Sequence, residues 1–121
     1  MNPTSRPTPR VRETLPGNLA KRPSPRESAL VTQILATLRA LPETWAVKVH
    51  GSIYSAAGTP DILGSHRGRA IALEVKRHGG RVTSLQKRHL ALWNASGAVC
   101  GVVHDVGEVR ELLGLAEEKS A

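Results

Sequence analysis

Residues 59–76 read TPDILGSHRGRAIALEVK, and this stretch decides the fold. Its last seven residues form the clearest strand pattern in the chain. Neighbouring strand residues point to opposite faces of a sheet, so Glu74 and Lys76 share one face and the large apolar residues share the other. Read alone, the Glu74 and Lys76 pair could be an exposed strand face with a local ion pair, worth roughly a few tenths of a kcal/mol.

Asp61 gives this strand a second interpretation. Residues 61–63 predict a short strand and residues 65–68 a turn, so Asp61 would lie close to Glu74 on an adjacent strand. Two neighbouring carboxylates repel each other unless a cation lies between them. An oxygen-only ligand set suits Mg²⁺ or Mn²⁺ rather than zinc, and the backbone carbonyl of Val75 could complete it. Beside such an ion, Lys76 would position a water or neutralise charge during phosphodiester cleavage.

Two further polar side chains lie on inward faces of predicted helices. The sequence SPRE at residues 24–27 predicts a helix start capped by Ser24, and Glu27 lies in the middle of the apolar arc of that helix. The sequence TSLQ at residues 83–86 predicts a second helix start, with Gln86 on the inward side. Each residue also has an ordinary explanation as part of a capping box, which need not exclude a contact of Glu27 to a metal through water.

The remaining elements follow from periodicity and from the positions of glycine and proline. Beyond the strands over 61–63 and 70–76, the patterns predict a helix from Ser24 to Pro42, a strand over 45–49, a loop over 50–59, a helix from Thr83 to Gly97, a strand over 98–103 and a helix over 106–115. This order of helix, three strands, helix, strand and helix predicts an α/β fold with a mixed sheet between helices. For a subunit interface we look first to the apolar positions of the last helix and the final strand.

Composition narrows the class of protein. The chain has 121 residues and a formal charge of +7, which permits one domain and favours an anionic partner, nucleic acid first. The single Cys100 excludes a disulfide framework and a cysteine-built zinc site, and we assign it to packing. His66, His78 and His89 lack metal-ligand spacing and are assigned to the surface or the core. Three aromatic residues are too few for a base-stacking platform.

The basic residues fall into two groups. Residues 1–26 carry +5 of the net charge and six of the eight prolines, a composition that cannot build a core. We therefore expect a flexible basic arm over residues 1–23, a folded domain over 24–116 and a frayed C-terminus over 117–121. The arm could equally serve solubility alone. The candidates for DNA contacts in the domain are Lys48, Arg67, Arg69, Arg77, Arg81, Lys87 and Arg88.

The ordered set Pro60-Asp61, Glu74-Val75-Lys76 and Gln86 after a Gly-Gly break, with Glu27 on a preceding helix, resembles the PD-(D/E)xK nuclease superfamily and in detail its VRR-NUC family. The resemblance covers residues 27–103. It implies a restriction-endonuclease-like core in which Asp61, Glu74 and the Val75 carbonyl hold the metal and Lys76 is the catalytic lysine. Gln86 would be the helix-borne glutamine of the catalytic site, and Glu27 the acid of the first helix.

The resemblance also carries a functional expectation. Stand-alone members of the family resemble Holliday-junction resolvases of phage and bacterial origin that work as homodimers. We expect a Mg²⁺- or Mn²⁺-dependent endodeoxyribonuclease that cuts branched DNA, Holliday junctions foremost, in recombination, repair or phage replication. With no apolar run long enough for a membrane span and no secretory signal, we expect it in the cytoplasm of a bacterial or phage-infected cell, at the nucleoid. Two alternatives stay open: a catalytically silent module that binds branched or duplex DNA, and a restriction-type duplex nuclease.

Overall fold

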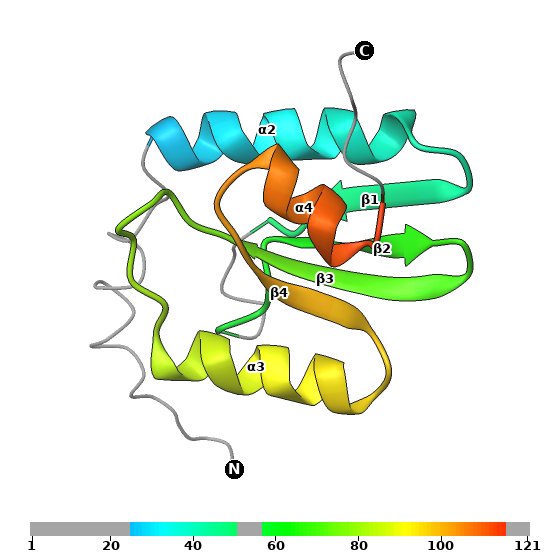
Figure 1. The fold of residues 1–121 in the computed structure, drawn as a ribbon. Helices are drawn as coiled ribbons and strands as arrows, with labels where there is room; N and C mark the ends of the chain where they lie inside the picture. Colours follow the sequence, from blue (N-terminus) through cyan, green and yellow to red (C-terminus); the bar gives the residue numbers. More distant parts are fainter. Residues whose placement is uncertain (1–24, 51–56, 116–121) are drawn as a thin grey trace, which may run out of the picture.

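The computed structural model describes residues 25–50 and 57–115 (Figure 1). The elements are α2 (Pro25–Ala40), β1 (Thr44–Lys48), β2 (Ile62–His66), β3 (Arg69–Val75), α3 (Ser84–Ala95), β4 (Val99–Val103) and α4 (Val106–Leu112). Their order is the predicted one, and the predicted α/β class is confirmed. The predicted arm, the C-terminal end beyond residue 115 and part of the predicted loop over 50–59 lie outside the described residues. Within the described ranges, no helix has the length and apolar character to cross a membrane.

The four strands form one mixed sheet in the order β1-β2-β3-β4. β1, β2 and β3 pair antiparallel, whereas β4 runs parallel to β3. A parallel pair needs a crossover connection, and α3 provides it between β3 and β4. Figure 1 shows α2 and α4 on one side of the sheet and α3 on the other, so the ends of β3 and β4 lie between two helical layers.

The core lies between the sheet and the layer formed by α2 and α4. The apolar face predicted for β3 contributes Ile71, Leu73 and Val75, all of which are buried. Of the apolar positions on β4 and α4 that we considered for a subunit interface, Val103 and Val109 are buried in this core and are not available to a partner, and the interface itself stays a prediction. Among the described residues, the large apolar side chains that are exposed lie on β1 and α3: Trp45, Val47, Leu85 and Leu92.

The hairpin between β2 and β3 is tighter than the sequence pattern predicts. β2 continues through His66, so Ser65 and His66 are strand residues and not part of the turn. Arg67 and Gly68 alone form the connection, with φ values of 53° and 81°. Two successive positive φ values are the geometry of a type I′ turn, whose twist matches that of the flanking strands. The register of the hairpin is thereby fixed, with Ile62 opposite Leu73.

The ends of the last two helices follow from their caps. Thr83 caps α3 in a complete capping box, as predicted, and Gly97 follows the helix with φ 102°. α4 ends at Leu112, three residues before the predicted end, because Gly114 adopts φ 74° and turns the chain away.

Candidate active site

Two carboxylates meet where β3 ends. Continuing the register of Ile62 with Leu73 by one residue places Asp61 opposite Glu74. Asp61 Oδ2 accepts a hydrogen bond from the Val75 N–H at 2.8 Å, which ties this side chain to the end of β3. Glu74 is only 2% exposed. The interpretation of Glu74 and Lys76 as an exposed ion pair is therefore wrong, and the predicted proximity of Asp61 to Glu74 is confirmed.

The two oxygens of Glu74 have different surroundings. Oε2 accepts a hydrogen bond from Gln86 Nε2 at 2.9 Å, and the ammonium Nζ of Lys76 lies 3.7 Å from the same oxygen. Oε1 is buried, and no hydrogen-bond donor among the described residues reaches it. A buried polar atom without a partner is costly and calls for an explanation, such as a bound ion.

The environment of Glu74 also changes its protonation. Burial, the negative charge of Asp61 and a hydrogen bond between the two carboxyl side chains together raise the pKa of Glu74 to about 8, and the positive charge of Lys76 opposes this only in part. Without a cation the carboxyl group is therefore protonated at neutral pH. A divalent cation at this position would reverse the balance, because it favours the charged carboxylate.

Gln86 has two roles in this geometry. Its side-chain oxygen accepts the Thr83 N–H at 2.9 Å and closes the capping box of α3. Its amide nitrogen donates to Glu74. The capping explanation and the site explanation hold together, because the two ends of one amide serve the two purposes.

Glu27 reaches the same region from the first turn of α2. Its Oε2 lies 3.5 Å from the Arg77 backbone N–H, and its negative charge adds a small upward effect on the pKa of Glu74. Residues 77–80 form a turn in which the Gly80 N–H donates to the Arg77 carbonyl at 2.8 Å and Gly79 has φ 85°. A Cβ on Gly80 would lie 3.4 Å from Glu27 Oε2, so the predicted Gly-Gly break brings the chain directly against Glu27.

These residues fit a hydrated hard cation rather than a closed metal cage. Among the described residues, no three His, Cys, Asp or Glu side chains are grouped so that they alone could hold a metal. Mg²⁺, however, usually keeps several waters and is held by only one or two carboxylates. Asp61 and the unpartnered Oε1 of Glu74 supply that donor set, all in oxygen, at the end of β3.

Two solved structures that match this fold are described as VRR_NUC domains. One, described as a VRR_NUC domain, matches with a TM-score of 0.62 at 24% identity, over 75% of this chain and 97% of that chain. The chain has the fold of a VRR_NUC domain. A second, described as a VRR_NUC domain protein, matches with a TM-score of 0.58 at 14% identity, over 73% of this chain and 84% of that chain. The sequence matches no protein-family profile and no curated protein.

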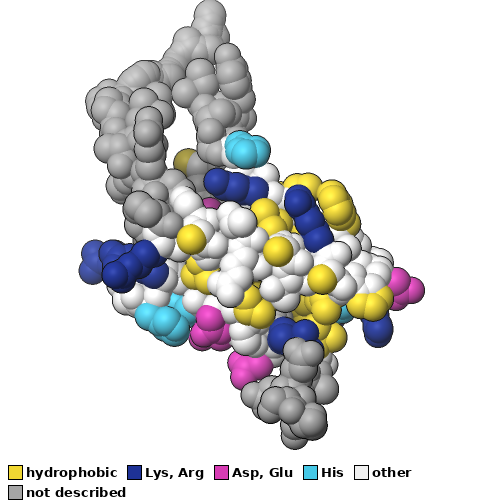
Figure 2. Space-filling model, turned by 90° about the horizontal axis from the view of Figure 1, so that it is seen from above, with side chains coloured by type: hydrophobic (Ala, Val, Ile, Leu, Met, Phe, Trp, Pro, Cys, Tyr) yellow, Lys and Arg dark blue, Asp and Glu magenta, His cyan; other side chains and the backbone are white. Residues whose placement is uncertain are grey.

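The VRR_NUC fold separates the basic residues that the sequence grouped together. In the view of Figure 2 the Lys and Arg side chains form separate groups and not one continuous surface. Arg67 and Arg69 lie at the hairpin, at the far end of β3 from the carboxylates, where Arg67 pairs with Glu43 and Arg69 Nε donates to the Gly97 carbonyl. Five candidates lie on segments that lead to the site: Lys48 at the end of β1, Arg77 and Arg81 between β3 and α3, and Lys87 and Arg88 on the first turns of α3.

His66, His78, His89 and Cys100 lie as predicted, at the surface or in packing contacts. His66 exchanges a hydrogen bond with Thr44 Oγ1 at 2.7 Å, and Cys100 donates its thiol to the Leu90 carbonyl at 3.4 Å, in keeping with packing roles. Burial raises the pKa of the Cys100 thiol. His78, however, stacks on His104, a residue that sequence reasoning missed, with ring centroids 4.9 Å apart. The only signal that could have brought the two histidines together is that His78 follows β3 and His104 follows β4, two neighbouring parallel strands whose ends meet at one edge of the sheet.

Proposed function

We propose that the chain is a Mg²⁺- or Mn²⁺-dependent endodeoxyribonuclease that hydrolyses phosphodiester bonds. One observation carries the proposal: the buried carboxylate of Glu74 keeps an unpartnered oxygen next to Asp61, with the Lys76 ammonium 3.7 Å from its other oxygen. If Glu74 only formed a structural ion pair, both of its oxygens would have partners in the protein, whereas a carboxylate that binds a metal leaves one oxygen for the ion. The VRR_NUC fold of the chain supports the assignment to nucleases.

In this proposal Asp61, Glu74 and the Val75 carbonyl hold the divalent ion, and Glu27 contacts it through water. When bound, the ion supplies a Lewis acid that polarises the phosphoryl oxygen and lowers the pKa of a water. The Gln86 amide fixes the orientation of the Glu74 carboxylate through Oε2, which directs Oε1 away from the helix contact. Lys76 is largely buried, so its ammonium offsets the negative charge that develops on the phosphate more strongly than an exposed lysine would.

The proposed substrate is branched DNA, with four-way junctions foremost, and the proposed assembly is a homodimer in the cytoplasm. A two-fold dimer would place two such sites on two strands. The family resemblance of the motif residues supports this choice. A restriction-type enzyme would instead prefer a particular linear sequence, and a silent binding module would bind without cutting.

The test is a cleavage panel with metal-dependence controls. Four-way junctions, forks, flaps and linear duplexes are incubated with the wild-type protein in Mg²⁺, in Mn²⁺ and in EDTA. We expect cleavage of the branched substrates with either ion and none in EDTA. Asp61→Asn, Glu74→Gln and Lys76→Met should each lower the cleavage rate by about a hundredfold or more while junction binding persists.

The matched control is Glu111→Gln, which removes one carboxylate from the exposed side of α4 and should cut at the wild-type rate. Failure of the wild-type protein to cut any substrate with either ion, although it binds DNA, would leave the binding module as the function. Preferred cleavage of one linear sequence would favour the restriction-type enzyme.

A further inference from the structure

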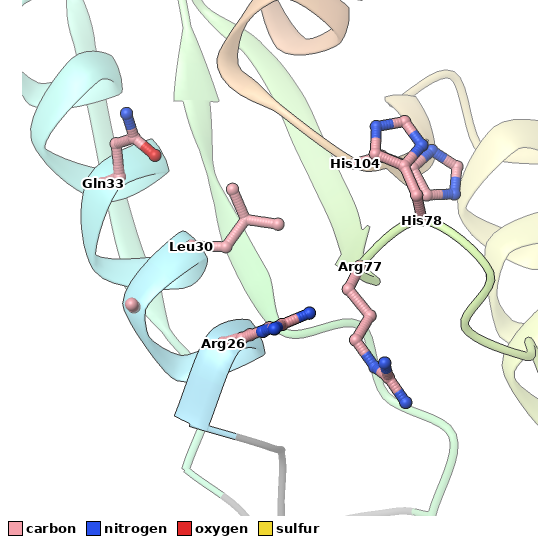
Figure 3. A pocket seen from close by; sticks show the side chains of 7 residues that line it. Arg26, Leu30, Gln33, Arg77, His78 and His104 are labelled. Atoms are coloured by element: carbon pink, nitrogen blue, oxygen red, sulfur yellow. The ribbon is translucent and has the colours of Figure 1, made fainter.

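An open groove lies beside the candidate active site, on the side of the sheet that α2 covers (Figure 3). Its volume is about 440 Å³. One wall is the first half of α2, and the other is the chain that leaves β3 and β4. The residues used below are Arg26, Leu30 and Gln33 from α2, Arg77 and His78 after β3, and His104 after β4.

The groove is positively charged. Arg26 and Arg77 are both exposed, and Figure 3 shows the Arg26 side chain reaching toward the opposite wall, while the Arg77 side chain extends from that wall along the mouth of the groove. None of the described residues that line the groove is acidic. The two groove histidines are held as a stacked pair by acids that do not line it: His78 Nε2 lies 3.6 Å from Asp105, and His104 Nδ1 lies 2.8 Å from Glu108.

The groove is directly connected to the carboxylate site. Arg77 follows Lys76 in the chain, and its backbone N–H faces Glu27 at 3.5 Å. His104 follows Val103, whose carbonyl accepts the Lys76 N–H at 3.1 Å. A polymer that lies across the ends of β3 and β4 would therefore pass from one site to the other.

We propose that this groove binds a backbone phosphate of the same DNA strand, next to the phosphate that occupies the candidate active site. The inference rests on the proposed function, because it takes the bound polymer to be DNA. Arg26 and Arg77 each carry a guanidinium group, whose planar fork of donors suits phosphate oxygens, and the Gln33 amide is a further donor in the lining. Leu30 lies between these polar groups and offers an apolar contact to a sugar.

The test uses a background in which bound DNA stays intact. In Glu74→Gln protein, the dissociation constants of a four-way junction and of a linear duplex are measured over a series of salt concentrations. Adding Arg26→Ala and Arg77→Ala together should weaken binding of both about tenfold and reduce the salt slope by about one unit for the lost phosphate contact. The fold should persist, because both side chains are exposed and the Arg77 contact to Glu27 uses the backbone N–H, which alanine keeps.

The matched control is the pair Arg67→Ala and Arg69→Ala in the same background, which removes an equal charge at the far end of the sheet. It should leave the affinity and the slope near the parent values. Unchanged DNA affinity and slope in the double variant would overturn the inference, and so would an equal loss in the control. The inference would also be overturned if the double variant bound DNA as its parent does but no longer bound inorganic phosphate, since the groove would then take a free anion and not DNA. A wild-type protein that binds DNA through Arg26 and Arg77 without cutting it would overturn the nuclease proposal and still support the groove.

Discussion

The carboxyl group of Glu74 binds more protons in the folded chain than in the unfolded chain between pH 4.5 and about 8. Wherever the folded state holds the extra proton, the free energy of unfolding falls as the pH rises. We therefore expect the metal-free protein to lose stability from pH 5 to pH 8 at up to about 1.4 kcal/mol per pH unit from this group. Denaturant unfolding in EDTA across this range measures the effect, and Glu74→Gln, which cannot ionise, should remove it.

Metal binding should restore the folding stability that is lost when Glu74 loses its proton. At pH 8 the addition of Mg²⁺ should raise the midpoint of unfolding of the wild-type protein, because an ion that binds only the folded state stabilises it. Glu74→Gln should show a much smaller rise, whereas Glu111→Gln should respond as the wild type does. Equal responses of the wild type and Glu74→Gln would exclude Glu74 as a ligand.

At the scale of residues, helix phase and strand alternation located most of the candidate site. Glu27 and Gln86 could be placed near the carboxylates because each has a fixed angular position on its helix. The stack of His78 on His104 could not, because it depends on how far two separate chain segments travel beyond their strands. The unpartnered state of Glu74 Oε1 was equally invisible, since it follows from burial by all the neighbouring segments at once.

Helix α3 depends on Gln86 both for its cap and for its contact to the site. Gln86→Glu keeps the oxygen that accepts the Thr83 N–H but replaces the donor to Glu74 with another carboxylate. We expect this variant to keep the helix yet need more Mg²⁺ for half-maximal cleavage. Gln86→Ala should lose both contacts and about 1 kcal/mol of stability as well. Circular dichroism during thermal unfolding and metal titration of cleavage separate the two effects.

Strand β2 requires a glycine at residue 64. A Cβ there would lie 2.7 Å from Ala46 Cα and against the Trp45 carbonyl on β1, so Gly64→Ala should push β1 away at a cost of about 1–3 kcal/mol. The environment of Trp45 should change with it, which tryptophan fluorescence detects. Gly68→Ala is the control: it strains a positive φ at the turn but meets no atom within 4 Å, so the fluorescence should stay as in the wild type.

The same close approach explains why the sequence predicted β2 too short. Gly64, Ser65 and His66 lack the apolar alternation of a strand, and glycine usually indicates a turn. In the structure Gly64 is required because β1 passes so near, and His66 is fixed by its hydrogen bond to Thr44. Both reasons are contacts between strands, which local sequence patterns cannot show.

For the whole molecule, +4 of the formal charge of +7 lies in residues 1–23, outside the domain that carries the site. We expect deletion of residues 1–21 to weaken DNA binding and flatten its dependence on salt, because fewer cations are displaced from the DNA. The chemical step should persist, as no residue of the candidate site is removed. Binding isotherms at several salt concentrations, together with single-turnover cleavage, test this. Equal affinity and equal slope for the truncated protein would show that the segment takes no part in binding.

The order of elements and the mixed sheet could be predicted because each helix and strand has its own apolar periodicity, and capping residues, glycine or proline mark its ends. The placement of the layers could not be read in the same way. Apolar residues on β4 and α4 looked available for a partner, yet two of them, Val103 and Val109, are buried in the core of the chain. In residues 25–50 and 57–115, the large apolar side chains left exposed are instead on the edge strand β1 and on α3.

Helix α3 has no buried residue, in contrast to α2, which contributes Val31, Ile34 and Leu38 to the core. A helix held by so little buried surface opens at a lower free-energy cost than the rest of the fold, so its amides should exchange with solvent sooner. We expect each opening to withdraw Gln86 and admit water to Glu74, which would then lose its proton more readily. If the proposed cation binds there, its access to Glu74 should follow the fluctuations of this one helix.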